Sequence, residues 1–119
     1  MNVEQYREYC LSKKGVTEHF PFDNVTLVFK VMGKMFALCA LDRIPFSVNL
    51  KCDPEYAIEL RDEYGDAIIA GFHMNKKHWN TVSPQGTLTD KLFLKLIDHS
   101  YDLVVNGLTK KVKKALENL

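Results

Sequence analysis

Residues 25–41, VTLVFKVMGKMFALCAL, contain the strongest β signal of the chain. Two runs rich in β-branched and aromatic residues, Val25–Met32 and Met35–Leu41, are separated by Gly33-Lys34 alone. A two-residue separation that contains glycine is typical of a tight β-hairpin, because glycine adopts the positive φ that the turn requires. The stretch therefore predicts an antiparallel hairpin with Gly33 at the first turn position.

A third strand and a helix follow this hairpin. Phe46, Val48 and Leu50 alternate with polar residues, which predicts a strand with one buried and one wetted face. Asp53-Pro54 supplies an N-cap acceptor and a proline at the first helical position, and Gly65 can end the helix.

The remaining apolar patterns predict three more helices and two short strands. The helices are expected over residues 3–13, 90–106 and 110–116, and the strands over 67–72 and 79–83. The resulting order is helix, three strands, helix, two strands and two helices. It predicts an α+β fold in one domain over residues 1–119, with an antiparallel sheet of about five strands and helices packed on one face.

The overall charge is nearly balanced. Sixteen Lys and Arg residues stand against fifteen Asp and Glu residues, a formal net charge of +1. The whole molecule therefore has no basic field that would draw it onto nucleic acid, and any such binding must come from a local patch. The last helix is locally basic, with Lys110, Lys111, Lys113 and Lys114, a run that suits phosphate contacts but also a solvated helix face.

The three cysteines, Cys10, Cys39 and Cys52, are odd in number and lack C-x-x-C spacing. This argues against a disulfide framework and predicts reduced, mostly buried thiols. No apolar run approaches membrane-spanning length, and the N-terminal residues do not follow the pattern of a signal peptide. We therefore expect a cytoplasmic protein without a membrane partner, and a monomer.

The segment at residues 71–80, GFHMNKKHWN, gathers two His, two Lys, two Asn and the only Trp. Together with residues 13–22, Asp53-Pro54 and residues 100–104, it resembles the MmcQ/YjbR family. The resemblance covers nearly the whole chain. It implies an α+β fold similar to that of CyaY, the bacterial frataxin, and a DNA-binding role, the label commonly given to the family. It brings no established set of catalytic residues.

Residues in this segment have the chemistry for nucleic-acid contacts. Lys76 and Lys77 can contact phosphates, and His78 or Asn80 can hydrogen-bond to phosphates or base edges. Trp79 can stack on a base if its face is exposed, but a lone Trp in a small domain is usually well buried, so we favour a core role.

Signatures of catalysis and metal binding are absent from the sequence. It contains no nucleophile elbow, phosphate-binding glycine loop or Cys-His signature. His73 and His78 lack the helical spacing of a zincin, and the acidic residues between Glu55 and Asp66 are typical of a solvated helix face. We therefore expect no enzymatic activity, no cofactor and no metal.

Two binding hypotheses remain. The first is a weak, largely sequence-independent DNA-binding module that uses Lys76, Lys77, His78 and Lys34, with the C-terminal lysines as a further candidate set. The alternative is a module for a protein or small molecule, in which residues 75–80 and the loop Phe20-Pro21-Phe22 border a pocket. An enzyme or cation-handling protein that uses the acidic helix and the histidines ranks behind both.

Overall fold

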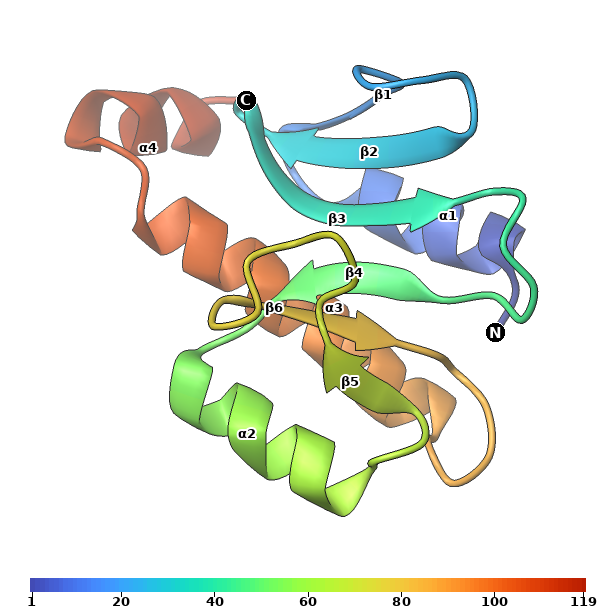
Figure 1. Ribbon diagram of the computed structural model, residues 1–119. Coiled ribbons are helices and arrows are strands. Elements are labelled where there is room, and N and C mark those ends of the chain that lie inside the picture. The colour runs from blue at the N-terminus through green and yellow to red at the C-terminus, as the bar shows by residue number, and fades with distance from the viewer.

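The computed structural model describes every residue from Met1 to Leu119 and contains six strands and four helices (Figure 1). All strand pairs are antiparallel, in the spatial order β1-β2-β3-β4-β6-β5. In chain order the elements are α1 Val3–Ser12, β1 Val16–His19, β2 Thr26–Val31, β3 Lys34–Ala40, β4 Val48–Lys51, α2 Pro54–Glu63, β5 Ile68–Ala70, β6 Trp79–Val82, α3 Asp90–Asn106 and α4 Lys110–Glu117.

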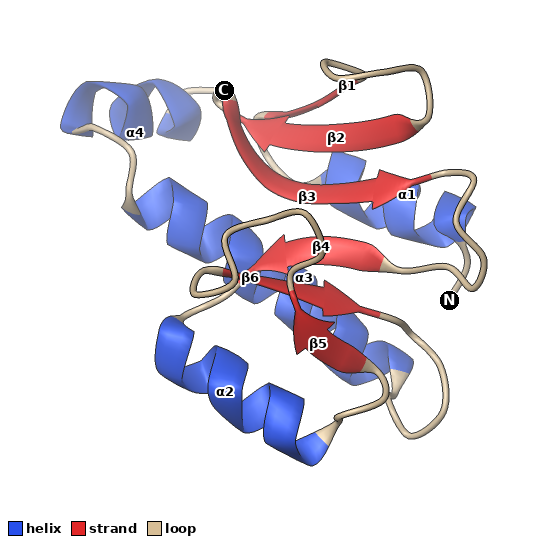
Figure 2. Cartoon of the chain, viewed as in Figure 1, coloured by secondary structure: helices blue, strands red, loops and turns tan.

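The main hydrophobic core lies between the sheet and the helices. Figure 2 shows α1 and α3 behind the sheet, while the loop between β5 and β6 crosses in front of it. Tyr6 of α1, Phe93 of α3 and Phe29 of β2 are fully buried in this core, and Ala57 and Leu60 of α2 belong to the same cluster. Full burial of one such large apolar side chain contributes roughly 1.5–3 kcal/mol. The α+β prediction with helices on one face is confirmed.

The predicted hairpin forms, but its turn is shifted by one residue. Val31 pairs with Lys34, so Met32 and Gly33 are the two turn residues and Lys34 already belongs to β3. Both turn residues have positive φ, 50° for Met32 and 84° for Gly33. Gly33 is therefore the second turn residue and not the first, as in a type I′ turn, whose twist matches that of the flanking strands.

The sheet has six strands and not five, because the sequence pattern did not reveal β1. Only Val16 of this strand is partly buried, whereas Thr17, Glu18 and His19 are exposed. An edge strand with one apolar residue has no alternation to detect. It forms by pairing with β2, where Val16 lies opposite Val31.

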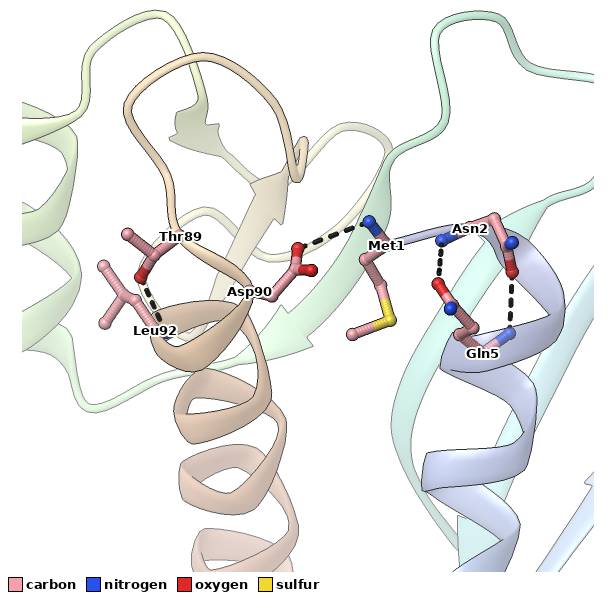
Figure 3. Close-up of polar contacts among 6 residues, drawn as sticks. All are labelled: Met1, Asn2, Gln5, Thr89, Asp90 and Leu92. Carbon is pink, nitrogen blue, oxygen red and sulfur yellow. Dashed lines mark hydrogen bonds and ion pairs between the residues drawn. The ribbon is translucent and has the colours of Figure 1, made fainter.

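Side-chain caps fix where two of the helices begin (Figure 3). The Asn2 side chain accepts a hydrogen bond from the Gln5 amide, and the Gln5 side chain accepts one from the Asn2 amide, which is a capping box. Thr89 accepts from the Leu92 amide at the start of α3. The Met1 amino group lies 3.3 Å from Asp90 and links the two helix starts.

Cys10, Cys39 and Cys52 are all free and buried, as predicted. Cys10 and Cys39 belong to the main core, where burial raises the pKa of each thiol to about 12. Among the helices, none combines the length and the apolar character required to cross a membrane.

Candidate functional site

A second, smaller hydrophobic cluster covers the face of the sheet that carries no helix. Trp79 of β6 packs there with Val28 and Leu38, and Met35 and Met74 lie against them. Trp79 is only 8% exposed, so the core role predicted for it is confirmed and its ring is not an open stacking platform. We call this surface of the sheet the helix-free face.

The loop Gly71–His78 lies over this cluster and is held by its own backbone. The Gly71 amide donates to the Trp79 carbonyl at 2.8 Å, and the Trp79 amide donates to the Asn75 carbonyl at 3.0 Å. The Asn75 side chain accepts from the Lys77 amide at 2.9 Å. A Cβ at Gly71 would lie 2.8 Å from the Trp79 Cβ and 2.9 Å from its carbonyl oxygen, so only glycine allows this approach.

Side chains from the strands and from α2 fasten the loop at both ends. The Thr81 hydroxyl accepts from the Phe72 amide at 2.9 Å and donates to Asn49 at 2.5 Å. The Arg61 guanidinium of α2 donates to the Asn80 side chain at 2.7 Å and to the Lys76 carbonyl. The loop is therefore a defined part of the fold that presents Lys76, Lys77 and His78 outward.

The four predicted contact residues differ in how free their side chains are. Lys76 is exposed, but its ammonium group donates to the Gly71 carbonyl at 3.0 Å and so links the two ends of the loop. Lys77, His78 and Lys34 are exposed and make no side-chain hydrogen bond or ion pair. Asn80 is buried beneath Arg61, so it is not an outward-facing contact.

The strand order brings these residues to one end of the molecule. Lys34 begins β3, β4 ends at Lys51, and β6 begins at Trp79, so the β2–β3 turn and residues 76–78 lie at the same end of the antiparallel sheet (Figure 1). Lys30 and Lys51 join them on the helix-free face, because they pair with Met35 and Trp79 respectively.

The two terminal helices add further lysines at this end. Residues 13–15 follow α1, and the Gly15 carbonyl accepts from the amide of Met32 in the turn. Leu116 of α4 lies against Gly15. The basic end, as we name it, comprises Lys13, Lys14, Lys30, Lys34, Lys51, Lys76, Lys77, Lys110, Lys111, Lys113 and Lys114.

The charge of the molecule is therefore strongly separated despite its balanced total. The segments that reach the basic end carry eleven lysines and five acidic residues, Asp53, Glu55, Asp98, Asp102 and Glu117, a formal charge of +6. The remaining chain has five Lys and Arg residues against ten Asp and Glu residues, a charge of −5, and together the two parts give the net +1. A field of one sign over one end attracts a polyanion even when the net charge is small.

A pocket opens at the other end of the helix-free face. It has a volume of about 500 Å³. Its apolar lining includes Leu38, Ala40 and Met74, and Phe22 and Phe72 stand at its mouth, 65% and 49% exposed. The predicted pocket beside the Phe20-Pro21-Phe22 loop therefore exists, although residues 72–74 border it and not residues 75–80.

Polar groups line the same pocket. Arg43 lies over the Phe72 ring, 4.9 Å from the ring centroid, and the His73 ring centroid is 4.0 Å from that of Phe72. Ser47 is 4% exposed and its hydroxyl makes no hydrogen bond. Asp42 is the acidic residue of the lining.

The acidic helix and the histidines do not assemble into a metal centre. Nowhere do three His, Cys, Asp or Glu side chains converge as metal ligands. The acidic side chains of α2, Glu55, Glu59, Asp62 and Glu63, are all exposed, as on an ordinary solvated helix face.

Comparison with known protein families agrees with this fold and loop. The family model described as YjbR matches residues 11–103, which include all of the sheet and the loop over it. The chain belongs to the YjbR family. This confirms the resemblance drawn from the segment at residues 71–80.

Relatives in the YjbR family match along most or all of the chain. YjbR of Escherichia coli strain K12 is 33% identical over 119 residues, 100% of both chains. YbdF of Escherichia coli O157:H7 is 42% identical over 96 residues, covering 80% of this chain and 77% of YbdF. Both are named as uncharacterized proteins, so they carry no activity to compare.

Solved structures share the same architecture. The crystal structure of Deinococcus radiodurans protein DR2400, with a DUF419 family domain, aligns with a TM-score of 0.90 at 41% identity, covering 98% of this chain and 88% of that one. A Pseudomonas syringae protein aligns with a TM-score of 0.73 at 29% identity, covering 87% and 98%. The fold is thus shared with both of these solved structures.

Sequence reasoning missed several residues of both candidate sites. Lys30 and Lys51 were not predicted as site residues, because placing them beside the loop requires the strand order. Arg43 and His73 lie thirty residues apart in the chain and meet only at Phe72. The sequence did draw attention to the region of His73, because this residue lies within the unusual segment at residues 71–80.

Proposed function

We propose that this YjbR-family protein is a binding module, without catalytic activity, that binds nucleic acid through the phosphate backbone at the basic end. The observation that carries the proposal is the charge separation, +6 over the segments of the basic end against −5 over the rest. Lysine ammonium groups act on phosphates as point charges and release condensed counterions, which favours binding without reading bases.

Several side chains at the basic end are free for such contacts. Lys34 and Lys77 are exposed and unpaired, and Lys30 and Lys51 stand on the same face as the loop that carries Lys77. Lys13 and Lys14 are occupied, because Lys13 pairs with Asp98 and Lys14 donates to the Glu117 carbonyl. The contacts are therefore assigned chiefly to Lys34, Lys77 and His78, with Lys76 in support.

We expect the affinity for nucleic acid to be weak and similar for different base sequences. Trp79 is buried, so base stacking on it contributes nothing, and the lysine ammonium groups act as point charges without the planar fork of arginine. Nearly all affinity then comes from phosphate contacts, which makes it steeply dependent on salt.

The experiment is a titration of labelled duplex DNA, single-stranded DNA and RNA, followed by fluorescence anisotropy at several salt concentrations between about 50 and 200 mM. The informative variant is Lys34→Ala/Lys77→Ala, because neither ammonium group bonds within the protein. We avoid Lys76→Ala, since it also removes the hydrogen bond to Gly71. The double variant should lower affinity for all sequences and reduce the duplex salt slope by about 0.9 for each lost contact.

The matched control is Lys91→Ala/Lys95→Ala, which removes two exposed lysines of α3 outside the basic end. It changes the net charge by the same amount and should leave the salt slope as in the parent. Equal losses in both double variants would mean that only net charge matters. Unaltered binding by Lys34→Ala/Lys77→Ala would exclude this end as the nucleic-acid site.

The pocket on the helix-free face supports a second role, binding of a small molecule. It opens beyond the end of β3 at Ala40, whereas the basic end includes the start of β3 at Lys34. The two roles therefore do not compete for the same residues.

A further inference from the structure

The pocket beside Phe72 has the dimensions and walls of a small-molecule site. Its volume of about 500 Å³ lies within the range of roughly 300–1,000 Å³ typical of ligand pockets. Phe22 and Phe72 leave much of their rings exposed at its mouth, although large aromatic side chains normally bury most of their surface. A flat apolar ligand would cover both rings and the floor formed by Leu38 and Ala40.

The mouth also carries a cation with no acidic partner. Arg43 is exposed and forms no ion pair, and its guanidinium is held over the Phe72 ring at 4.9 Å. A guanidinium presents parallel N–H donors that match the two oxygens of a carboxylate. Arg43 therefore supplies the group that would hold an acidic substituent of a ligand whose ring lies against Phe72.

Two further features mark this place as built for a ligand. His73, whose ring centroid lies 4.0 Å from that of Phe72, has φ of 59°, a conformation that costs a non-glycine residue energy and is concentrated at functional sites. Ser47 also lines the pocket, and its hydroxyl bonds to no other residue, so it can donate a hydrogen bond to a ligand oxygen.

The lining also limits how much negative charge a ligand can carry. Asp42 stands at the same mouth and, like Arg43, forms no ion pair. With one carboxylate and one guanidinium in the lining, a dianion such as a phosphate monoester is disfavoured, while a ligand with a single negative charge can bind to Arg43. We propose that the pocket binds a small planar aromatic monocarboxylic acid, with its ring against Phe22 and Phe72 and its carboxylate on Arg43.

The test uses the full chain and a set of matched compounds, without nucleic acid. Benzoate, 2-naphthoate and indole-3-acetate are titrated into isotope-labelled protein, each beside its neutral amide, and the amide signals are followed by NMR. We expect shifts that cluster at Ser47 and Phe72–Met74. We also expect each acid to bind at least about tenfold more tightly than its amide, as one charge-assisted contact implies.

Three variants separate the parts of the proposed site. Arg43→Gln, at an exposed position, should remove the preference for acid over amide but keep amide binding. Phe22→Ser should weaken acid and amide alike, because Phe22 is 65% exposed and offers only its ring. Ala40→Phe should fill the pocket and abolish both. Lys91→Gln is the control for loss of one exposed cation elsewhere and should bind as the parent does.

The outcomes that would overturn the proposal are distinct. Absence of binding by all three acids excludes this ligand class. Equal affinity for acid and amide, or an unchanged preference in Arg43→Gln, removes the role of Arg43. Shifts that cluster at Lys34 and Lys77 would mean that the acids merely pair with the basic end. None of these results depends on whether the protein binds DNA.

Discussion

At the scale of single residues, the β2–β3 turn depends on backbone conformation alone. Gly33 has φ of 84°, and a Cβ built on it would meet nothing within 4 Å. Glycine is therefore not needed at this position to avoid crowding by neighbouring atoms. It is needed because, in any other residue, the left-handed conformation brings Cβ too close to the carbonyl oxygen. Met32 bears the same conformation at φ of 50° and contributes strain that Gly33 does not.

Gly33→Val should lower the free energy of unfolding by roughly 1–2 kcal/mol, the cost of the left-handed conformation in a residue other than glycine. Gly33→Asn should cost much less, because Asn visits this region readily. Urea denaturation of both variants measures the difference. An unchanged midpoint for Gly33→Val would show that the turn does not need a positive φ.

The buried thiols should make the protein sensitive to alkaline pH. Desolvation raises the pKa of Cys10, Cys39 and Cys52 from 9.0 to about 12. Below pH 9 the thiols are protonated in both states, so stability is fully present. Between pH 9 and 12 the unfolded chain releases protons that the folded chain retains, so stability falls, by at most about 1.4 kcal/mol per thiol and pH unit.

Urea midpoints measured from pH 8 to 11 check this expectation, and Cys39→Ala should lose less stability over the interval than the parent. Thiol titration of denatured, unreduced protein should count three free groups. A midpoint independent of pH, or a count below three in fresh protein, would contradict the assignment of three protonated buried thiols.

At the scale of elements, the loop Gly71–His78 behaves as a piece of the fold. It covers Trp79, is fastened by Thr81 and Arg61, and presents residues to both candidate sites, Lys77 to the basic end and Phe72 to the pocket. Its order therefore decides the geometry of both surfaces. The close approach of Gly71 to Trp79 is the contact on which this order depends most directly.

Gly71→Ala should destabilise the protein by about 1–3 kcal/mol, as overpacking does, because its Cβ would lie 2.9 Å from the Trp79 carbonyl oxygen. Gly107→Ala is the matched control: its Cβ would have ordinary contacts at 3.6 Å, and its φ is −85°. The control should be neutral or slightly stabilising. Thermal unfolding and Trp79 fluorescence report both effects, and equal midpoints for the two variants would refute the steric argument.

At the scale of the whole molecule, the distribution of charge matters more than its sum. A net charge of +1 predicts little affinity for a phosphate surface, whereas a basic end of +6 predicts that the protein binds such a surface through this end. This property belongs to the folded protein, since its lysines come from five separate stretches of the chain. Unfolding would disperse them.

The folded protein should therefore bind to phosphocellulose at neutral pH and elute with salt. Lys34→Ala/Lys77→Ala should elute at lower salt than Lys91→Ala/Lys95→Ala, although both have the same net charge. Elution of both variants at the same salt concentration would mean that retention depends on net charge alone and that the basic end is not a binding surface.

Much of the fold was predictable because its signals are local. The hairpin and the Asp53-Pro54 helix start depend on residues within a few positions of one another. The helix start formed as predicted, and the hairpin formed between the predicted runs with its turn one residue earlier. The burial of Trp79 also followed from its size and isolation. Where local information ran out, the predictions failed: β1 is an exposed edge strand that needs β2, and the turn register depends on how β2 and β3 pair.

The α+β class, the family, the state of the cysteines and the exposed lysines of the loop could all be predicted from the amino-acid sequence. The strand order was needed to show that Lys34 and Lys77 share one end with Lys30, Lys51 and α4, and the folded loop to show that Lys76 bonds to Gly71. Periodicity and turn chemistry act between near neighbours in the chain. Charged surfaces and pockets form between residues that the order of strands brings together, and that order cannot be predicted from any one segment of the sequence.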